Sequence, residues 1–298
     1  MIVAYGCVLF ASLLAQGPVG QDVPEQVFYR AFFHDRGERD APRALRLYRR
    51  FLAESPKHAL AGEAARFTLN LLQQMRRGKE ATAFAKQHAA LLTESAKPGI
   101  NSRFLDPNMR VADLKATFEG ESREIFKHRR RLVELVGLKP GDVIADVGAG
   151  TGLFSWPFAR TVGKQGRVYA VELAPRFVSH LKRLAKNGNL DQVTVVECGE
   201  RSTELKAASV DVVFLCDTYH HFEFWKDTMA SIVRALRPGG RLVLIDFERI
   251  PGKSRKWVLG HVRAGKAAVR AEIESTGLHF VRQIATPLKE NYMMEFRR

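Results

Sequence analysis

A glycine-rich segment holds the residues of this chain that are best suited to binding a small ligand. Its sequence is Asp146-Val147-Gly148-Ala149-Gly150-Thr151-Gly152, between an apolar run at 143–147 and a helical pattern at 153–161. Glycine lets the backbone approach a ligand closely, and the first turn of a helix offers N–H groups that have no partner within the helix. We therefore predict a strand–turn–helix unit whose turn binds a ligand.

An acidic residue at the end of the next apolar run adds a second ligand contact. Glu172 closes the run 167–172. It lies about 20 residues beyond the glycines, the separation at which a carboxylate can bind the hydroxyls of a ribose. The carboxyl ends of parallel strands meet at one edge of a sheet, so Glu172 and the glycine turn are expected to be neighbours. These residues together predict a ligand with a nucleoside part.

Two nucleoside ligands fit this pattern to different degrees. A dinucleotide-binding turn has the spacing G-x-G-x-x-G, which would place glycine at position 153, where this chain has Leu153. Asp146 would also repel a pyrophosphate, whereas it would attract a cation. S-adenosylmethionine carries a sulfonium and an α-amino group and no phosphate, so the residues favour it over a dinucleotide.

Four segments resemble the motifs of class I S-adenosylmethionine-dependent methyltransferases, in the order of that family. They are Val143–Gly152, Val168–Glu172, Val210–His221 and Ala235–Leu242. The resemblance spans residues 120–298 and is closest to the small-molecule branch that includes ubiquinone and menaquinone biosynthesis enzymes. It implies S-adenosylmethionine as the methyl donor and a small molecule as the acceptor.

The resemblance implies a cofactor contact at each matching position. Asp146 would bind the amino group of the cofactor, Glu172 the ribose diol, and Leu173 the adenine. Glu200 stands where the family often has aspartate. The full set of implied contacts is Asp146, Gly148, Ala149, Gly150, Gly152, Glu172, Leu173, Gly199, Glu200 and Asp217.

Three residues after the fourth predicted strand are candidates for the transfer step. Asp217 ends that strand, and His220 and His221 could act as a base because imidazole titrates near neutral pH. Methyl transfer needs a base only when the acceptor loses a proton, so Asp217 could equally cap a turn and both histidines could be structural. No cysteine or histidine spacing is typical of a metal centre, so no metal ligand is predicted.

Segments outside the four motifs are expected to recognise the acceptor. Residues 118–124 precede the first core helix, and residues 219–225 form an unusually aromatic loop. Residues 249–270 are basic, and could bind an acidic acceptor or form a solvated helix. Two further functions stay open: methylation of a protein, and cofactor binding without catalysis by a chain that recruits a partner.

Alternating strand and helix patterns predict a parallel sheet with helices on both faces. A helix is expected at 122–136, and the last two strands are expected to form an antiparallel hairpin at the sheet edge. The predicted fold class is α/β, a Rossmann-like, mostly parallel seven-stranded sheet with a C-terminal antiparallel hairpin, preceded by a small all-α region. The clearest predicted strands are 143–147, 167–172, 193–198, 210–216, 241–247, 280–286 and 291–296.

The region at 22–96 has apolar residues at helical spacing. Its segment 44–56 resembles the second helix of a tetratricopeptide repeat, and 79–92 a degenerate copy. Two such units are fewer than a free-standing solenoid needs, so they are expected to dock on a neighbour or to bind a protein partner. Residues 97–117 are predicted to be a linker and 118–298 the methyltransferase domain. The predicted helices are 24–33, 41–54, 60–76 and 80–94.

The first 20 residues contain no charged side chain. The apolar stretch 1–17 resembles the core of a secretory signal, with 15–17 as a loose cleavage site, or a membrane anchor, although the positive residues that precede such cores are missing. Export would separate the chain from a cytosolic cofactor. Export, membrane anchoring and a cytoplasmic location therefore all stay open.

The net charge of +15 results from 47 Lys and Arg against 32 Asp and Glu. This excess is spread along the chain, and its densest cluster, 127–131, lies in a predicted helix. The sequence has no pattern typical of an RNA-binding aromatic platform, a helix-turn-helix or a zinc finger, so no nucleic-acid partner is expected.

Overall fold

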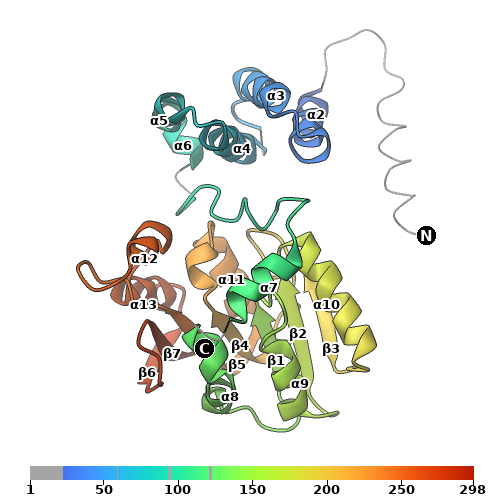
Figure 1. Ribbon diagram of the computed structural model, residues 1–298, viewed down its shortest axis with the longest axis vertical. Coiled ribbons are helices and arrows are strands. Elements are labelled where there is room, and N and C mark those ends of the chain that lie inside the picture. The colour runs from blue at the N-terminus through green and yellow to red at the C-terminus, as the bar shows by residue number, and fades with distance from the viewer. Residues whose placement is uncertain (1–22, 59, 93–94, 121–122) are drawn as a thin grey trace. The chain divides into compact units, whose positions relative to one another are not determined.

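The computed structural model describes residues 23–58, 60–92, 95–120 and 123–298, which form two compact units that divide between Leu91 and Leu92 (Figure 1). The signal-like stretch 1–17 lies outside the described residues. Among the described residues, no helix combines the length and the apolar composition needed to span a bilayer.

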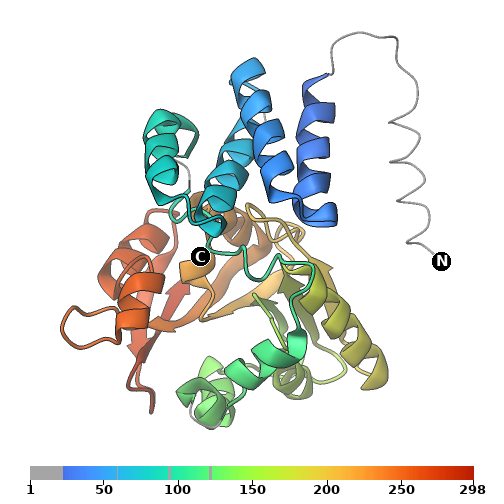
Figure 2. The same ribbon diagram turned by 45° about the horizontal axis from the view of Figure 1, so that its top comes forward.

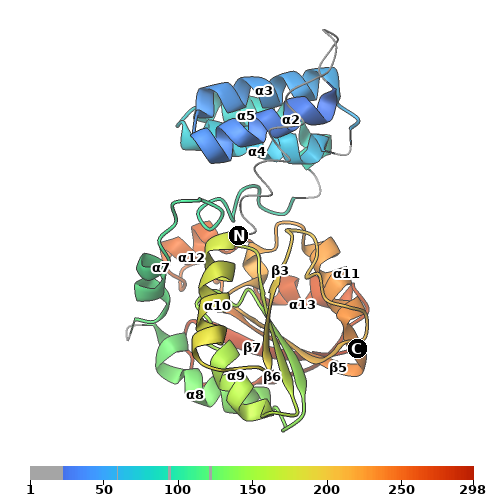
Figure 3. The same cartoon turned by 90° about the vertical axis from the view of Figure 1, so that its right-hand side faces the viewer.

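The N-terminal unit is helical, as predicted. Each of its longer helices packs against the next one in the sequence, and Figure 3 shows them side by side. Asp40 begins α3 by accepting a 3.0 Å hydrogen bond from the backbone N–H of Arg43. The core contains the buried rings of Phe28, Tyr48 and Phe51. The helices are α2 (Pro24–Phe33), α3 (Ala41–Glu54), α4 (Ala61–Gln74), α5 (Gly78–Gln87) and α6 (Ala89–Leu92), with a π-helical turn at His34–Glu38.

The C-terminal unit contains a single seven-stranded sheet, counted over the described residues, with the order β3-β2-β1-β4-β5-β7-β6. The first five strands are parallel, whereas β7 runs antiparallel to both β5 and β6, which confirms the predicted fold class. The strands are β1 (Val143–Val147), β2 (Arg167–Glu172), β3 (Val193–Glu197), β4 (Val210–Cys216), β5 (Leu236–Phe247), β6 (His279–Ile284) and β7 (Asn291–Arg297).

Helices cover both faces of this sheet, because strand residues alternate between two buried cores. Ile144 of β1 belongs to the core under α8, α9 and α10, whereas its neighbour Ala145 belongs to the core under α11 and α13. This arrangement explains why the strands are apolar runs without polar alternation. The helices are α8 (Glu124–Val136), α9 (Ser155–Val162), α10 (Pro175–Asn187), α11 (Trp225–Ala235), α12 (Lys256–His261) and α13 (Lys266–Glu274).

The segment before α8, expected to be a linker, is packed against the sheet unit. It contains α7 (Val111–Phe118), and Met109 and Leu114 share an apolar cluster with Ala174 and Phe177. The amide of Asn101 donates a 3.1 Å hydrogen bond to the carbonyl of His221. Figures 1 and 2 show this segment running beside the carboxyl ends of the strands. Its apolar residues therefore belong to the core of the C-terminal unit.

Candidate functional site

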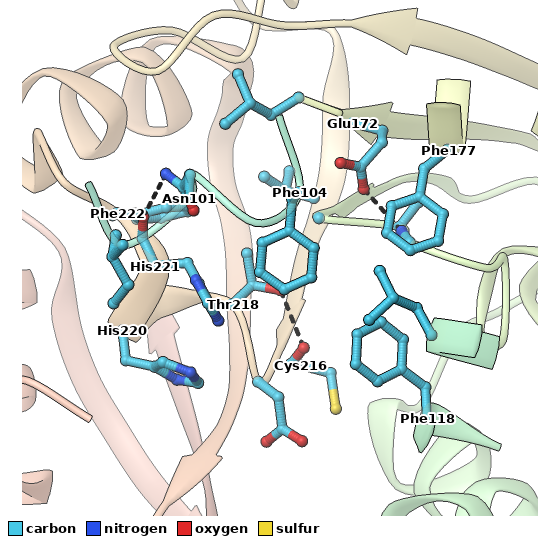
Figure 4. A pocket seen from close by; sticks show the side chains of 18 of the residues that line it. Asn101, Phe104, Phe118, Glu172, Phe177, Cys216, Thr218, His220, His221 and Phe222 are labelled. Carbon is cyan, nitrogen blue, oxygen red and sulfur yellow. Dashed lines mark hydrogen bonds between the residues drawn. The ribbon is translucent and has the colours of Figure 1, made fainter. Parts of the chain in front are cut away.

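A cavity of about 760 Å³ lies at the carboxyl ends of the parallel strands, entirely within the C-terminal unit. The turns after β1 to β4 form one part of its wall, and the segment 100–118 together with α12 forms another. Figure 4 shows Glu172 and Phe177 at one side of the cavity, His220 and His221 at the other, and Phe104 between them. The predicted strand-end residues are thus gathered around a single space.

The glycine turn is built from three residues with left-handed backbone angles, which are φ +76° at Gly148, +54° at Gly150 and +83° at Gly152. A Cβ atom at Gly148 would lie 2.4 Å from the side chain of Thr218, and one at Gly152 would lie 2.5 Å from the ring of Trp156. Gly148 and Gly152 are therefore required by packing within the protein. A Cβ at Gly150 would meet no protein atom closer than 3.9 Å, so a side chain there would enter the cavity.

Glu172 joins the turn after β2 to the turn after β1. One carboxylate oxygen accepts a 2.8 Å hydrogen bond from the N–H of Gly150, and the other accepts one of 2.8 Å from Ala174. The carboxylate is buried, and this burial raises its pKa in spite of the two N–H donors. Each oxygen keeps a lone pair for a ligand hydroxyl.

Asp146 lies at the floor of the cavity with 3% of its surface exposed. Its carboxylate accepts a 2.6 Å hydrogen bond from the hydroxyl of Ser155. Burial raises the pKa of Asp146 to about 7, and the negative charge of Glu172 adds to the shift. Two buried carboxylates that face one cavity would be stabilised by a cationic ligand. This property fits the sulfonium and ammonium groups of S-adenosylmethionine.

Asp217 ends β4 and has two partners that the sequence analysis did not identify. It forms an ion pair with Arg123 and accepts a 2.7 Å hydrogen bond from the amide of Asn291. Burial raises its pKa to about 6, although the charge of Arg123 opposes the shift. Arg123 belongs to the segment 118–124 that was expected near the cofactor, whereas nothing local marks Asn291, which begins β7.

The paired histidines have different environments. His220 is buried, and its Nδ1 lies 2.7 Å from a carboxylate oxygen of Asp246 on β5. Burial lowers the pKa of His221 well below its ordinary value, and the charge of His220 contributes to this shift. The Nε2 of His221 lies 3.3 Å from the Nε2 of His261 on α12. The lowered pKa keeps the His221 ring neutral at pH 7 and makes it a weak base.

Most of the predicted site residues line this cavity. Gly152 is the exception, and a Cβ atom there would meet the ring of Trp156. All three segments expected to recognise the acceptor contribute side chains, whereas Asn101 and Phe104 come from the segment expected to be a linker. The predicted residues in the cavity wall are Asp146, Gly148, Ala149, Gly150, Glu172, Leu173, Gly199, Glu200, Asp217, His220 and His221.

Comparison with known proteins identifies the class to which this fold and site belong. Residues 145–244 match the family model of a methyltransferase domain. A ubiquinone/menaquinone biosynthesis C-methyltransferase, UbiE, of Hydrogenovibrio crunogenus is 28% identical over 123 residues, which are 41% of this chain and 48% of that protein. Nocamycin O-methyltransferase of Saccharothrix syringae is 32% identical over 154 residues, which are 51% of this chain and 54% of that protein. The chain thus spans about half the length of these two relatives.

A solved structure shows the same fold. The S-adenosylmethionine-dependent methyltransferase of Aquifex aeolicus aligns with a TM-score of 0.55 and 22% identity, covering 63% of this chain and 98% of that one. The fold is that of a Rossmann-like methyltransferase. The C-terminal unit is accordingly a class I S-adenosylmethionine-dependent methyltransferase domain, and S-adenosylmethionine is its cofactor.

Proposed function

We propose that this chain transfers the methyl group of S-adenosylmethionine to a small molecule with a largely apolar body. The observation that carries the proposal is the single cavity shared by two groups of residues. Buried carboxylates and the glycine turn form one part of its wall, and the other part is aromatic. The volume of about 760 Å³ lies within the range of small-molecule sites.

The donor would be held by the turns that follow β1, β2 and β3. Glu172 would bind the ribose hydroxyls, and Asp146 would attract the α-ammonium group. The open space beside Gly150 would admit the cofactor close to the backbone. Leu173, together with Gly199 and Glu200, would line the adenine position. These assignments follow the burial and the position of each residue in the cavity wall.

Bound S-adenosylmethionine would supply a methyl group that is already activated. The protein then has to hold the acceptor in line with that group and to exclude water. Asp217, fixed by Arg123 and Asn291, would place a negative charge near the sulfonium. An acceptor that loses a proton would need a base, and both His220 and His221 line the cavity.

The acceptor would contact the part of the cavity wall that is formed by residues outside the four methyltransferase motifs. Four aromatic residues from four separate segments meet there: Phe104, Phe222, Phe247 and Trp257. Such a wall suits a planar or apolar acceptor. The curated relatives support a small molecule, since one is a ubiquinone/menaquinone biosynthesis C-methyltransferase and another is a nocamycin O-methyltransferase.

Two measurements on the full chain test this function. Calorimetry should show binding of S-adenosylmethionine and of its demethylated product, S-adenosylhomocysteine. Incubation with a methyl-labelled donor and fractionated cell extract should then label a compound of low mass. Label in protein alone would favour a protein acceptor recruited through residues 22–96. Cofactor binding without any labelled product would favour a non-catalytic role, and the absence of cofactor binding by folded protein would refute both proposals.

A further inference from the structure

Three histidines from two segments that are far apart in the sequence meet at the cavity wall. His220 and His221 lie on the short helix Tyr219–His221 after β4, and His261 ends α12. One ring nitrogen from each lies within 4.8 Å of the other two, and all three residues line the cavity. Such a cluster has the composition of a three-histidine metal site with one position open for a ligand.

The spacing of the rings agrees with this interpretation. Zinc binds imidazole nitrogens at about 2.0–2.1 Å, and two such nitrogens at a tetrahedral metal are about 3.3 Å apart. The Nε2 atoms of His221 and His261 are separated by 3.3 Å. The Nδ1 of His221 is buried without a hydrogen-bond partner in the described part of the chain, whereas its Nε2 contacts His261.

His220 has the support expected of a metal ligand. Its Nδ1 contacts Asp246, and the same carboxylate accepts hydrogen bonds from the N–H groups of His220, at 3.1 Å, and Phe247, at 2.8 Å. A carboxylate that holds one ring nitrogen fixes the tautomer and directs the other nitrogen to a metal. The Nε2 of His220 is the nitrogen that remains for this purpose.

Neighbouring side chains hold the ring of His261 in place. The ring of Trp257 stacks on His261 at a centroid distance of 5.0 Å. The ammonium group of Lys97 is a nearby positive charge that would disfavour the binding of a metal cation. It donates 2.6 Å hydrogen bonds to the carbonyls of Gly260 and His261.

We propose that His220, His221 and His261 bind one divalent transition-metal ion, with zinc as the ion best suited to this ligand set, and that its remaining position opens into the cavity. The use of this position rests on the proposed function. A hydroxyl group of the acceptor could bind to the metal there, and the metal would lower the pKa of that hydroxyl. The metal site itself can be tested without any acceptor.

Titration of the chelator-treated full chain with Co²⁺, followed by Zn²⁺, tests the site. We expect one equivalent of Co²⁺ to give the intense visible absorption of four-coordinate cobalt, and Zn²⁺ to displace it. The variant His261→Gln should weaken Co²⁺ binding by at least about tenfold, since loss of a ligand should cost no less than loss of a supporting contact. His279→Gln, which changes an exposed histidine on β6, should bind as the unmodified chain does.

Three results would overturn the proposal: no saturable binding, a spectrum without four-coordinate bands, or equal binding by the His261→Gln chain. S-adenosylhomocysteine affinity, measured on the same samples, reports folding and tests the donor site separately. The titration can therefore disprove the metal site without disproving the methyltransferase function. The affinity measurement can likewise disprove the donor site without disproving the metal site. If His261→Gln does not fold, His221→Gln decides the question by the same titration.

Discussion

The backbone N–H of Gly150 donates a 2.8 Å hydrogen bond to the carboxylate of Glu172. This contact joins the turns after two neighbouring strands, so the residue expected to hold the ribose also fixes the glycine turn beside it. The other oxygen of Glu172 is held equally by Ala174. The two parts of the donor site are therefore one hydrogen-bonded unit, and a change at Glu172 should affect both.

Replacing Glu172 by alanine should weaken S-adenosylmethionine binding by about 1–3 kcal/mol, because charge-assisted hydrogen bonds are lost. Glu172→Gln should weaken binding less, since one oxygen acceptor remains. Glu197→Ala, at the exposed end of β3 and paired with Glu172 in the sheet, is the matched control and should bind normally. Calorimetry measures all three. An unchanged dissociation constant for Glu172→Ala would show that this side chain does not contact the cofactor.

Gly150→Val should abolish cofactor binding while the protein stays folded, because the new side chain would enter the cavity. The φ of +54° adds a backbone cost of about 1 kcal/mol or more. Gly137→Val has a similar cost at φ +66° at the end of α8, where no protein atom lies within 4 Å. Thermal denaturation of both variants measures the effect of backbone strain on stability. Calorimetry on both variants then shows whether the side chain at position 150 blocks the cofactor. Normal affinity in Gly150→Val would place the ligand elsewhere.

Cofactor affinity should rise between about pH 6 and pH 8. The pKa of Asp146 is raised to about 7, so its carboxyl is neutral below this pH and negative above it. Only the negative form attracts the α-ammonium group. Asp146→Asn should lower the affinity at pH 8 and flatten the pH profile, which calorimetry in a series of buffers can measure. A profile that is equally steep in the asparagine variant would assign the titration to another group.

The same carboxyl should make the ligand-free protein less stable at higher pH. Its folded pKa lies above its unfolded value, so the folded state binds more protons and the stabilisation is lost as the pH rises through about 7. Asp146→Asn should therefore stabilise the ligand-free chain by about 1 kcal/mol or more at pH 8, and have little effect near pH 4. Urea denaturation at the two pH values checks both statements.

Deletion of residues 1–91 should leave cofactor binding intact, because the cavity is formed within the C-terminal unit. Deletion of 1–115 should weaken it, since this variant loses Phe104 from the cavity wall and Met109 and Leu114 from the cluster beside Phe177. Calorimetry on both shortened chains compares them directly. Equal affinity in the two would mean that the segment 92–115 makes no contribution to the donor site.

The parts of the fold that depend on local patterns were predictable from the sequence. Val143–Val147 is apolar except for Asp146 and is followed by three glycines, so both β1 and the turn after it are marked within ten residues. The bounds of β5 were missed because Leu236 pairs with Val210 beyond an irregularity in the register, a feature that depends on the partner strand.

Contacts between distant segments could not be predicted in the same way. Arg123, Asp217 and Asn291 come from three separate segments, and the sheet places β4 and β7 on either side of β5. His261 lies 40 residues beyond His221, with no motif between them that marks a shared site. The segment 97–117 was predicted to be a linker, yet its apolar residues line one wall of the cavity or pack beside it, contacts with distant residues that no local pattern marks.

The position of β7 between β5 and β6 has a consequence for how the chain matures during synthesis. β6 leaves the ribosome before β7, its partner in the sheet, and so cannot join the sheet when it emerges. Asn291 of β7 also completes the contacts of Asp217. A chain in which β7 is not yet inserted thus carries an unpaired strand and an incomplete site, and an unpaired strand edge is prone to aggregation.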